Sequence, residues 1–292
     1  MRITNAILTK ESLRGLRAQM RDLAEARERA ATGVRVARAS DDPVAAASIM
    51  RSSDTLRALQ QYRSNVAAGQ SRLAVEDSVL EQLGNALTRA RELAVSQGGD
   101  TADEASRRTV RAEVEGLVEL TVGLANTRLG EAYVFGGAYS DTPPLPNGVP
   151  DPARPATGSP ALEIGNGSFV EGNHGAQEIF VDSGVMDALT DLSAALDAND
   201  PEAIQAAEAD LAAAFQRIQE IVGELGARMS QLDVTESNLA SLELNFEKLR
   251  SDLADADVAE AVTELVQRQT SLEASMLVNA RILDITLADY LR

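Results

Sequence analysis

The chain has 292 residues, contains no Cys and no Trp, and carries a formal net charge of −18. The absence of Cys excludes disulfides, thiol nucleophiles and Cys-ligated zinc. The acidic balance argues against nucleic-acid binding, which requires a cationic surface. The sequence has no apolar run of about 18 residues that could insert into a membrane, and its first residues lack the continuous apolar stretch of a cleavable signal peptide.

The N-terminal region predicts a helix, a break and a second helix start. Residues 13–23 place apolar side chains on one helical face, and Gly33 interrupts the pattern. In the run Ser40-Asp41-Asp42-Pro43, Asp42 can accept hydrogen bonds from the free amides of a first turn, and Pro43 suits the first helical position. We therefore interpret the Asp pair as a helix cap rather than as a metal site.

A long helix is predicted after Pro43, because apolar residues recur in it every seven positions. These residues are Leu59, Val66, Leu73, Leu80 and Leu87. The run Gln97-Gly98-Gly99-Asp100 ends this helix. Residues 100–104 then start another helix, which we expect to continue to about Leu129.

The middle of the chain has a different character. Seven of the nine prolines lie between Pro143 and Pro160. Residues 162–164, 168–170 and 178–181 lie between breaks rich in Gly and Asn and are predicted to be short strands. The single His of the chain, His174, is flanked by Asn and Gly and is predicted to be an exposed loop residue.

Helical patterning resumes near Val185 and continues to the end of the chain. After Pro201, a seven-residue repeat contains Ile218, Leu225, Leu232, Leu239, Phe246 and Leu253. A break at residues 255–257 is followed by a second apolar stripe. A helix over residues 202–254 would be about 80 Å long, at about 1.5 Å per residue, and this length predicts an elongated molecule.

We therefore predict a mainly α fold, an elongated antiparallel helical bundle or coiled coil that is formed by both termini. Residues 1–42 and 255–292 would be terminal helices, and residues 43–137 and 186–254 a long helical rod domain. Residues 138–185 would form a small inserted β-containing domain. The terminal segments carry net charges of +3 and −4, which favours their lying side by side.

Several blocks of the sequence resemble the flagellin family, the axial proteins of the bacterial flagellum. The blocks are residues 31–36, 39–47, 89–95, 124–128, 133–137, 272–276 and 285–291. The motif that precedes the second helix contains Gly33, Arg35, Ser40, Asp41, Asp42 and Pro43. Pro43, the exit at residues 133–137 and an end without a Gln-rich terminus resemble the hook–filament junction type of this family more than the flagellins.

The resemblance implies a structural function, as an adaptor ring between the hook and the flagellin filament. The implied partners are further copies of the chain, hook-associated protein 1, flagellin, a flagellar export chaperone and the export apparatus. The implied location is outside the cell, in the flagellum, after export without a cleavable signal peptide. The resemblance implies no cofactor and no membrane insertion.

The apolar stripes of the terminal helices are candidates for an inner assembly domain. Each side chain that becomes fully buried contributes about 1.5–3 kcal/mol, so we expect the stripes to pack against neighbouring subunits and to be marginally ordered before assembly. The predicted interface residues are Ile3, Ile7, Leu13, Leu16, Leu23, Leu265, Leu272, Met276, Leu283, Leu287 and Tyr290.

Two other functions remain open on the sequence alone. A minor flagellin would polymerise into filaments rather than stop at a ring. A secreted helical effector or adhesin would bind a ligand through the middle of the chain. An enzyme is not predicted, because no Ser, Lys or carboxylate belongs to a catalytic constellation.

Overall fold

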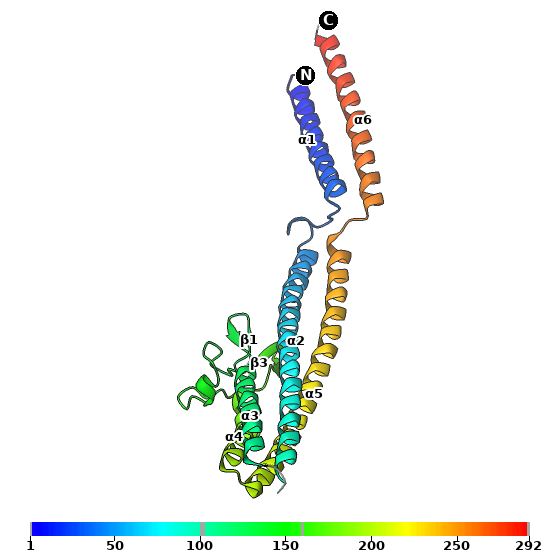
Figure 1. Cartoon of the computed structure of the whole chain (residues 1–292). Coiled ribbons are helices and arrows are strands. Elements are labelled where there is room, and N and C mark those ends of the chain that lie inside the picture. Colours follow the sequence, from blue (N-terminus) through cyan, green and yellow to red (C-terminus); the bar gives the residue numbers. More distant parts are fainter. Residues whose placement is uncertain (1, 100–102, 159–160, 291–292) are drawn as a thin grey trace. The chain divides into compact units, whose positions relative to one another are not determined.

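The computed structural model describes residues 2–99, 103–158 and 161–290, although the side chains of residues 2–6, 8–9 and 282–290 are outside this description. The chain separates into two compact units. The terminal unit contains residues 1–58 and 243–292, and the central unit contains residues 59–242. Most of the described residues are helical, which confirms the predicted fold class (Figure 1).

The terminal unit is built on two long helices from opposite ends of the chain. Helix α1 (Arg2–Thr32) packs along helix α6 (Val258–Tyr290), as Figure 1 shows. Arg29 Nη1 lies 3.0 Å from Glu264 Oε2, and Arg268 Nη1 lies 3.5 Å from Asp22 Oδ2. The expectation that the two ends lie side by side is confirmed.

Helices α2 (Pro43–Gln97) and α5 (Pro201–Ala254) contribute residues to both units. Within the central unit they pack together: Arg91 forms an ion pair with Glu208 at 3.0 Å, and Gln70 donates to Asp233 at 2.9 Å. The members of the predicted seven-residue repeats that fall in the central unit are buried, whereas Phe246 and Leu253 of the terminal unit are half-buried. The buried members are Leu59, Val66, Leu73, Leu80 and Leu87 on α2, and Ile218, Leu225, Leu232 and Leu239 on α5.

Capping side chains fix the helix starts. Asp42 Oδ1 accepts from the amides of Val44 and Ala45, at 3.1 and 3.0 Å. Pro43 is the first residue of α2, so the predicted cap is confirmed. Helix α3 (Glu104–Ala125) begins after Asp103, which accepts from the amide of Ser106 at 2.8 Å. Helix α4 (Val185–Ala198) begins where predicted, but its N-cap residue, Gly184, has a positive φ of 78° and no capping side chain.

The end of α3 differs from the prediction, which placed it near Leu129. The helix stops at Ala125. The amide side chain of Asn126 donates to the carbonyl of Leu145 and accepts from its amide, each at 3.0 Å. The chain then forms a short antiparallel pair of strands, β1 (Arg128–Leu129) and β2 (Ala132–Tyr133), which the sequence analysis did not predict.

The segment between α3 and α4 contains two of the three strands that were predicted in it. Strands β3 (Ala161–Gly165) and β4 (Ser168–Glu171) form an antiparallel hairpin, and a 3-10 turn, η1 (Pro146–Gly148), precedes them. The third predicted strand is wrong, because residues 178–181 lie in a π-helix, η2 (Gln177–Asp182). Its Phe180 is buried and packs edge to face against Phe135, with the ring centroids 5.7 Å apart. The local sequence does not specify this contact.

The prediction for His174 is also wrong. This residue lies between β4 and η2, but only 2% of it is exposed. Its ring contacts Glu76 of α2, which is 98 residues away in the sequence.

Across the part of the chain that the structure describes, no helix combines the length and the apolar character needed to cross a membrane.

Candidate assembly surface

Hydrophobic burial is distributed unevenly between the two units. The central unit contains most of the buried hydrophobic side chains of the described residues. In the described part of the terminal unit, these side chains are Ala26, Val36, Ala45, Ala46, Leu56 and Ala261. Four of the six are alanines, which remove little apolar area from water. The two long helices of the terminal unit therefore pack together without a large apolar core of their own.

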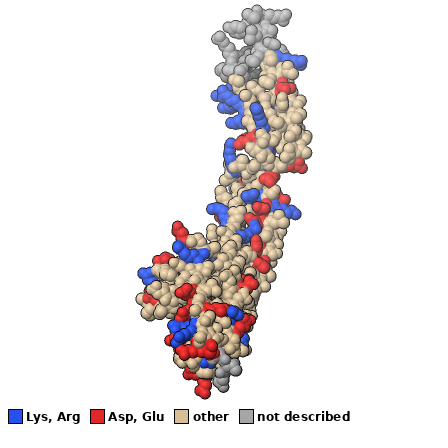
Figure 2. Space-filling view, in the orientation of Figure 1, with Lys and Arg blue, Asp and Glu red and all other residues tan. Residues whose placement is uncertain are grey.

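The apolar side chains of this unit are exposed instead. On α1, Ile7, Leu13 and Met20 are 52%, 48% and 56% exposed. The exposed hydrophobic residues of α6 are Val258, Val262, Val266, Met276, Leu277 and Val278. In Figure 2 the α1 side of this unit carries a group of basic side chains, whereas much of the α6 side is uncharged. The terminal unit thus offers an apolar surface on α6 next to a basic surface on α1.

The predicted interface residues take three kinds of position in the structure. Ile7, Leu13 and Met276 are exposed. Half-buried positions are occupied by Leu16, Leu23, Leu265 and Leu272. The side chains of Ile3, Leu283, Leu287 and Tyr290 lie outside the described residues.

The interface prediction did not include the row that Val258, Val262 and Val266 form on α6. These residues are 58%, 45% and 57% exposed. Their spacing of four places them on one helical face, so helical periodicity in the sequence could have identified this row.

The motif between α1 and α2 forms hydrogen bonds with the connection between α5 and α6. Gly33 adopts a positive φ of 68°, and its carbonyl accepts from the amide of Ala256 at 2.8 Å. Arg35 donates from its amide to the carbonyl of Ala254 at 2.7 Å, and from Nη2 to the carbonyl of Leu253 at 2.6 Å. These bonds join two connections of the terminal unit that are more than 200 residues apart in the sequence.

The other motif residues stabilise the turn that leads into α2. Asp41 Oδ2 accepts from the amide of Arg38 at 2.9 Å, and the hydroxyl of Ser40 lies beside Asp41. Asp42 caps α2 and also lies 3.8 Å from Arg35 Nη1. The motif therefore holds the path of the chain between the helices.

Comparisons with known proteins match both ends of the chain. Residues 3–138 match the bacterial flagellin N-terminal helical region, and residues 208–291 match the bacterial flagellin C-terminal helical region. Flagellar hook-associated protein 3 of Escherichia coli is 26% identical, over 94% of this chain and 95% of that protein. Flagellin of Bacillus subtilis is 24% identical, over 96% of each.

Solved structures share the fold. A putative flagellar hook-associated protein from Vibrio parahaemolyticus superposes with a TM-score of 0.66 at 20% identity, over 74% of this chain and all of that chain. The flagellar junction protein FlgL from Legionella pneumophila has a TM-score of 0.56 at 16% identity, over 73% of this chain and all of that chain. With matches to both helical regions of the family, in the order and positions that the sequence motifs predicted, this chain belongs to the bacterial flagellin family.

Proposed function

We propose that this chain is a structural component of the bacterial flagellum, the adaptor ring that joins the hook to the flagellin filament. The observation that carries the proposal is the incomplete core of the terminal unit. Its helices α1 and α6 pair with each other, yet they expose apolar rows and bury few large side chains. Neighbouring subunits would cover these rows, and each side chain that they bury adds about 1.5–3 kcal/mol.

The central unit supports the same function in a different way. Its repeats on α2 and α5 are buried within one chain, so a single chain forms the core of this part. The proposed division is an assembly domain of residues 1–42 and 255–292, a long helical domain of residues 43–137 and 186–254, and an inserted domain of residues 138–185. The assembly domain provides the contacts between copies.

The proposed partners follow from the proposed position of the ring, between the hook and the flagellin filament. One side of the ring meets hook-associated protein 1 and the other meets flagellin, while copies of the chain contact one another laterally. A flagellar export chaperone and the export apparatus deliver the chain to the outside of the cell. The absence of Cys removes disulfide cross-links as an obstacle to the passage of an unfolded chain.

A minor flagellin is the second candidate, because flagellins match this chain over nearly its whole length. The Escherichia coli relative, by contrast, is named flagellar hook-associated protein 3, and the match covers 94% of this chain and 95% of that protein. The two functions differ in how far the chain polymerises. A flagellin elongates filament seeds, whereas a junction protein stops after a ring.

Immunogold electron microscopy of intact flagella distinguishes the two functions. The antibody is raised against residues 138–185, and a strain that lacks the chain is the control for specificity. A narrow band of label where the hook meets the filament is the expected result. Label along the whole filament would identify a flagellin. Label only in the medium or elsewhere on the cell would contradict both functions and favour a secreted effector or adhesin.

A further inference from the structure

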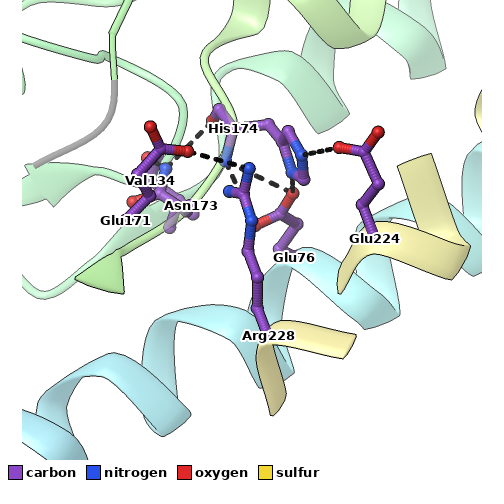
Figure 3. Close-up of polar contacts among 7 residues, drawn as sticks. All are labelled: Glu76, Val134, Glu171, Asn173, His174, Glu224 and Arg228. Atoms are coloured by element: carbon purple, nitrogen blue, oxygen red, sulfur yellow. Dashed lines mark hydrogen bonds and ion pairs between the residues drawn. The ribbon is translucent and has the colours of Figure 1, made fainter. Parts of the chain in front are cut away.

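A buried ionic cluster joins three parts of the central unit around the single His of the chain (Figure 3). Glu76 on α2 is fully buried, and His174 on the segment between β4 and η2 is 2% exposed. Nδ1 of His174 lies 2.5 Å from Glu76 Oε1, and the backbone amide of His174 lies 3.4 Å from each carboxylate oxygen. The ring and amide of one residue thus face the same buried carboxylate.

The other side of the imidazole faces α5. Nε2 of His174 lies 3.5 Å from Glu224 Oε2. One turn further along α5, Arg228 donates to Glu171 of β4 at 3.0 Å, and its positive charge acts against a charge on the imidazole. The negative charge of Glu178 of η2 favours the protonated ring and raises the pKa of His174. The charged groups around the imidazole are therefore four carboxylates, from α2, α5, β4 and η2, and one guanidinium.

The protonation state of this ring decides whether the cluster is an ion pair. A buried carboxylate is costly unless a cation or several donors compensate it. Burial disfavours the charged imidazole, but the hydrogen bond and the negative charge of Glu76 outweigh burial and raise the pKa of His174 above its ordinary value. The protonated ring can then donate to Glu76 and Glu224 at once.

We propose that His174 is a pH-sensitive clasp, which in its protonated form ties the segment between α3 and α4 to helices α2 and α5. Deprotonation removes the positive charge between Glu76 and Glu224 and loosens the segment. This inference goes beyond the adaptor function and does not depend on it, because every residue of the clasp lies within the central unit.

Other contacts hold the same segment without involving the imidazole. The side-chain amide of Asn65 on α2 donates to the carbonyl of Glu163 at 2.7 Å. Arg217 on α5 donates to the carbonyl of Ser183 at 2.6 Å. These bonds keep the β3–β4 hairpin and the end of the segment next to α4 attached while the clasp opens, so we expect a local loosening rather than global unfolding.

The sign of the pH effect follows from the raised pKa. A group whose pKa is higher in the folded than in the unfolded chain stabilises the fold fully below its unfolded pKa. This stabilisation is lost as the pH rises through the folded pKa. The clasp is therefore closed on the acidic side of neutrality and opens as the pH rises.

The single histidine makes the first test direct. In the full-length chain with isotope-labelled histidine, NMR reports one imidazole signal, which gives the pKa of His174 without assignment. The expected pKa lies above the ordinary value of about 6.5. Glu76→Gln should shift it downward. The exposed Glu224 provides the matched control, and Glu224→Gln should produce a smaller downward shift. A pKa at or below that of an unfolded histidine would overturn the proposal.

Hydrogen exchange then tests the loosening itself. After correction for the intrinsic pH dependence of exchange, the amides of residues 161–176 should lose protection as the pH rises from about 5.5 to about 8.5, the range in which His titrates. Amides in the buried part of α2 should not change. His174→Asn keeps a donor near the Nδ1 position but cannot titrate, and its protection should be independent of pH. An unchanged pH dependence in this variant, or none in the unmodified chain, would overturn the clasp.

Discussion

The guanidinium of Arg107 on α3 hydrogen-bonds both oxygens of Asn199, the residue that follows α4. Nη1 lies 2.5 Å from the side-chain oxygen and 3.4 Å from the carbonyl. The same side chain donates to the carbonyl of Gln97 at 3.1 Å and to that of Gly99 at 3.0 Å. Only 4% of Arg107 is exposed. A single buried cation thus satisfies the ends of both α2 and α4.

Arg107→Met should lower the free energy of unfolding by about 2–4 kcal/mol, because it removes the donor to three backbone carbonyls, among them that of the buried Gln97. Urea denaturation followed by circular dichroism measures the change. The neighbouring Arg108 is the matched control, since its side chain is 73% exposed and pairs with Glu104 of its own helix. Arg108→Met should change the stability by less than about 0.5 kcal/mol. Equal losses in the two variants would contradict the structural role of Arg107.

Asp42→Ala should destabilise the first turn of α2 by about 1 kcal/mol, because the amides of Val44 and Ala45 lose their acceptor. Hydrogen exchange at these two amides is the measurement, with faster exchange as the expected result. Asp42→Ser, which keeps a capping oxygen, should restore most of the protection. If the Ala variant exchanged no faster than the unmodified chain, the cap would have no energetic role.

Gly137→Ala should be more costly than an ordinary substitution at a position of positive φ. The φ angle of Gly137 is 59°, and a Cβ there would lie 2.4 Å from the carbonyl oxygen of Thr157. Gly130 has a φ of 65° but open space around its Cβ position. Gly130→Ala therefore measures the backbone strain alone, about 1–2 kcal/mol.

Thermal unfolding of the two Ala variants gives the difference between them. We expect Gly137→Ala to exceed Gly130→Ala by about 1–3 kcal/mol, since the neighbouring backbone must move. The same loss of stability in both variants would show that the approach to Thr157 does not constrain the segment.

The sequence predicted those features of the fold that repeat or that act locally. The seven-residue spacing from Leu59 to Leu87 requires only that one helical face be buried, and that face is buried. The cap at Asp42 depends on groups within three residues, and it is present. The opposite net charges of the terminal segments favoured pairing of the two ends of the chain, and α1 and α6 do pair.

The features that the sequence did not predict depend on contacts between distant residues. The burial of His174 results from its partner Glu76, 98 residues earlier in the chain. The end of α3 coincides with bonds between Asn126 and Leu145, which are 19 residues apart in the sequence. The short apolar run around Phe180 is compatible with a strand or with a helical turn. In the structure it is helical, and Phe180 packs against Phe135.

The predicted interface residues include only part of the exposed apolar surface of the terminal unit, for a related reason. Helical periodicity identifies apolar faces, but it does not say which face the partner helix within the same chain covers. The structure answers this for α6, where Leu265 and Leu272 are half-buried while Val258, Val262 and Val266 are exposed. The exposed row is therefore the better candidate for contacts with neighbouring subunits.

The most direct measurement compares the incorporation of two charged variants into flagella. Val266 on α6 of the terminal unit is 57% exposed, and Val234 on α5 of the central unit is 61% exposed. Each is replaced by Glu in a strain that lacks the unmodified chain, and the variant is quantified in purified hook–filament structures and in the medium. Because both side chains are exposed, neither variant should unfold the chain.

Val266→Glu should be secreted but absent from the flagella, since a charge would enter an apolar contact between subunits. Val234→Glu should be incorporated as the unmodified chain is. Equal incorporation of the two variants would contradict the claim that the exposed apolar row of the terminal unit is the assembly surface.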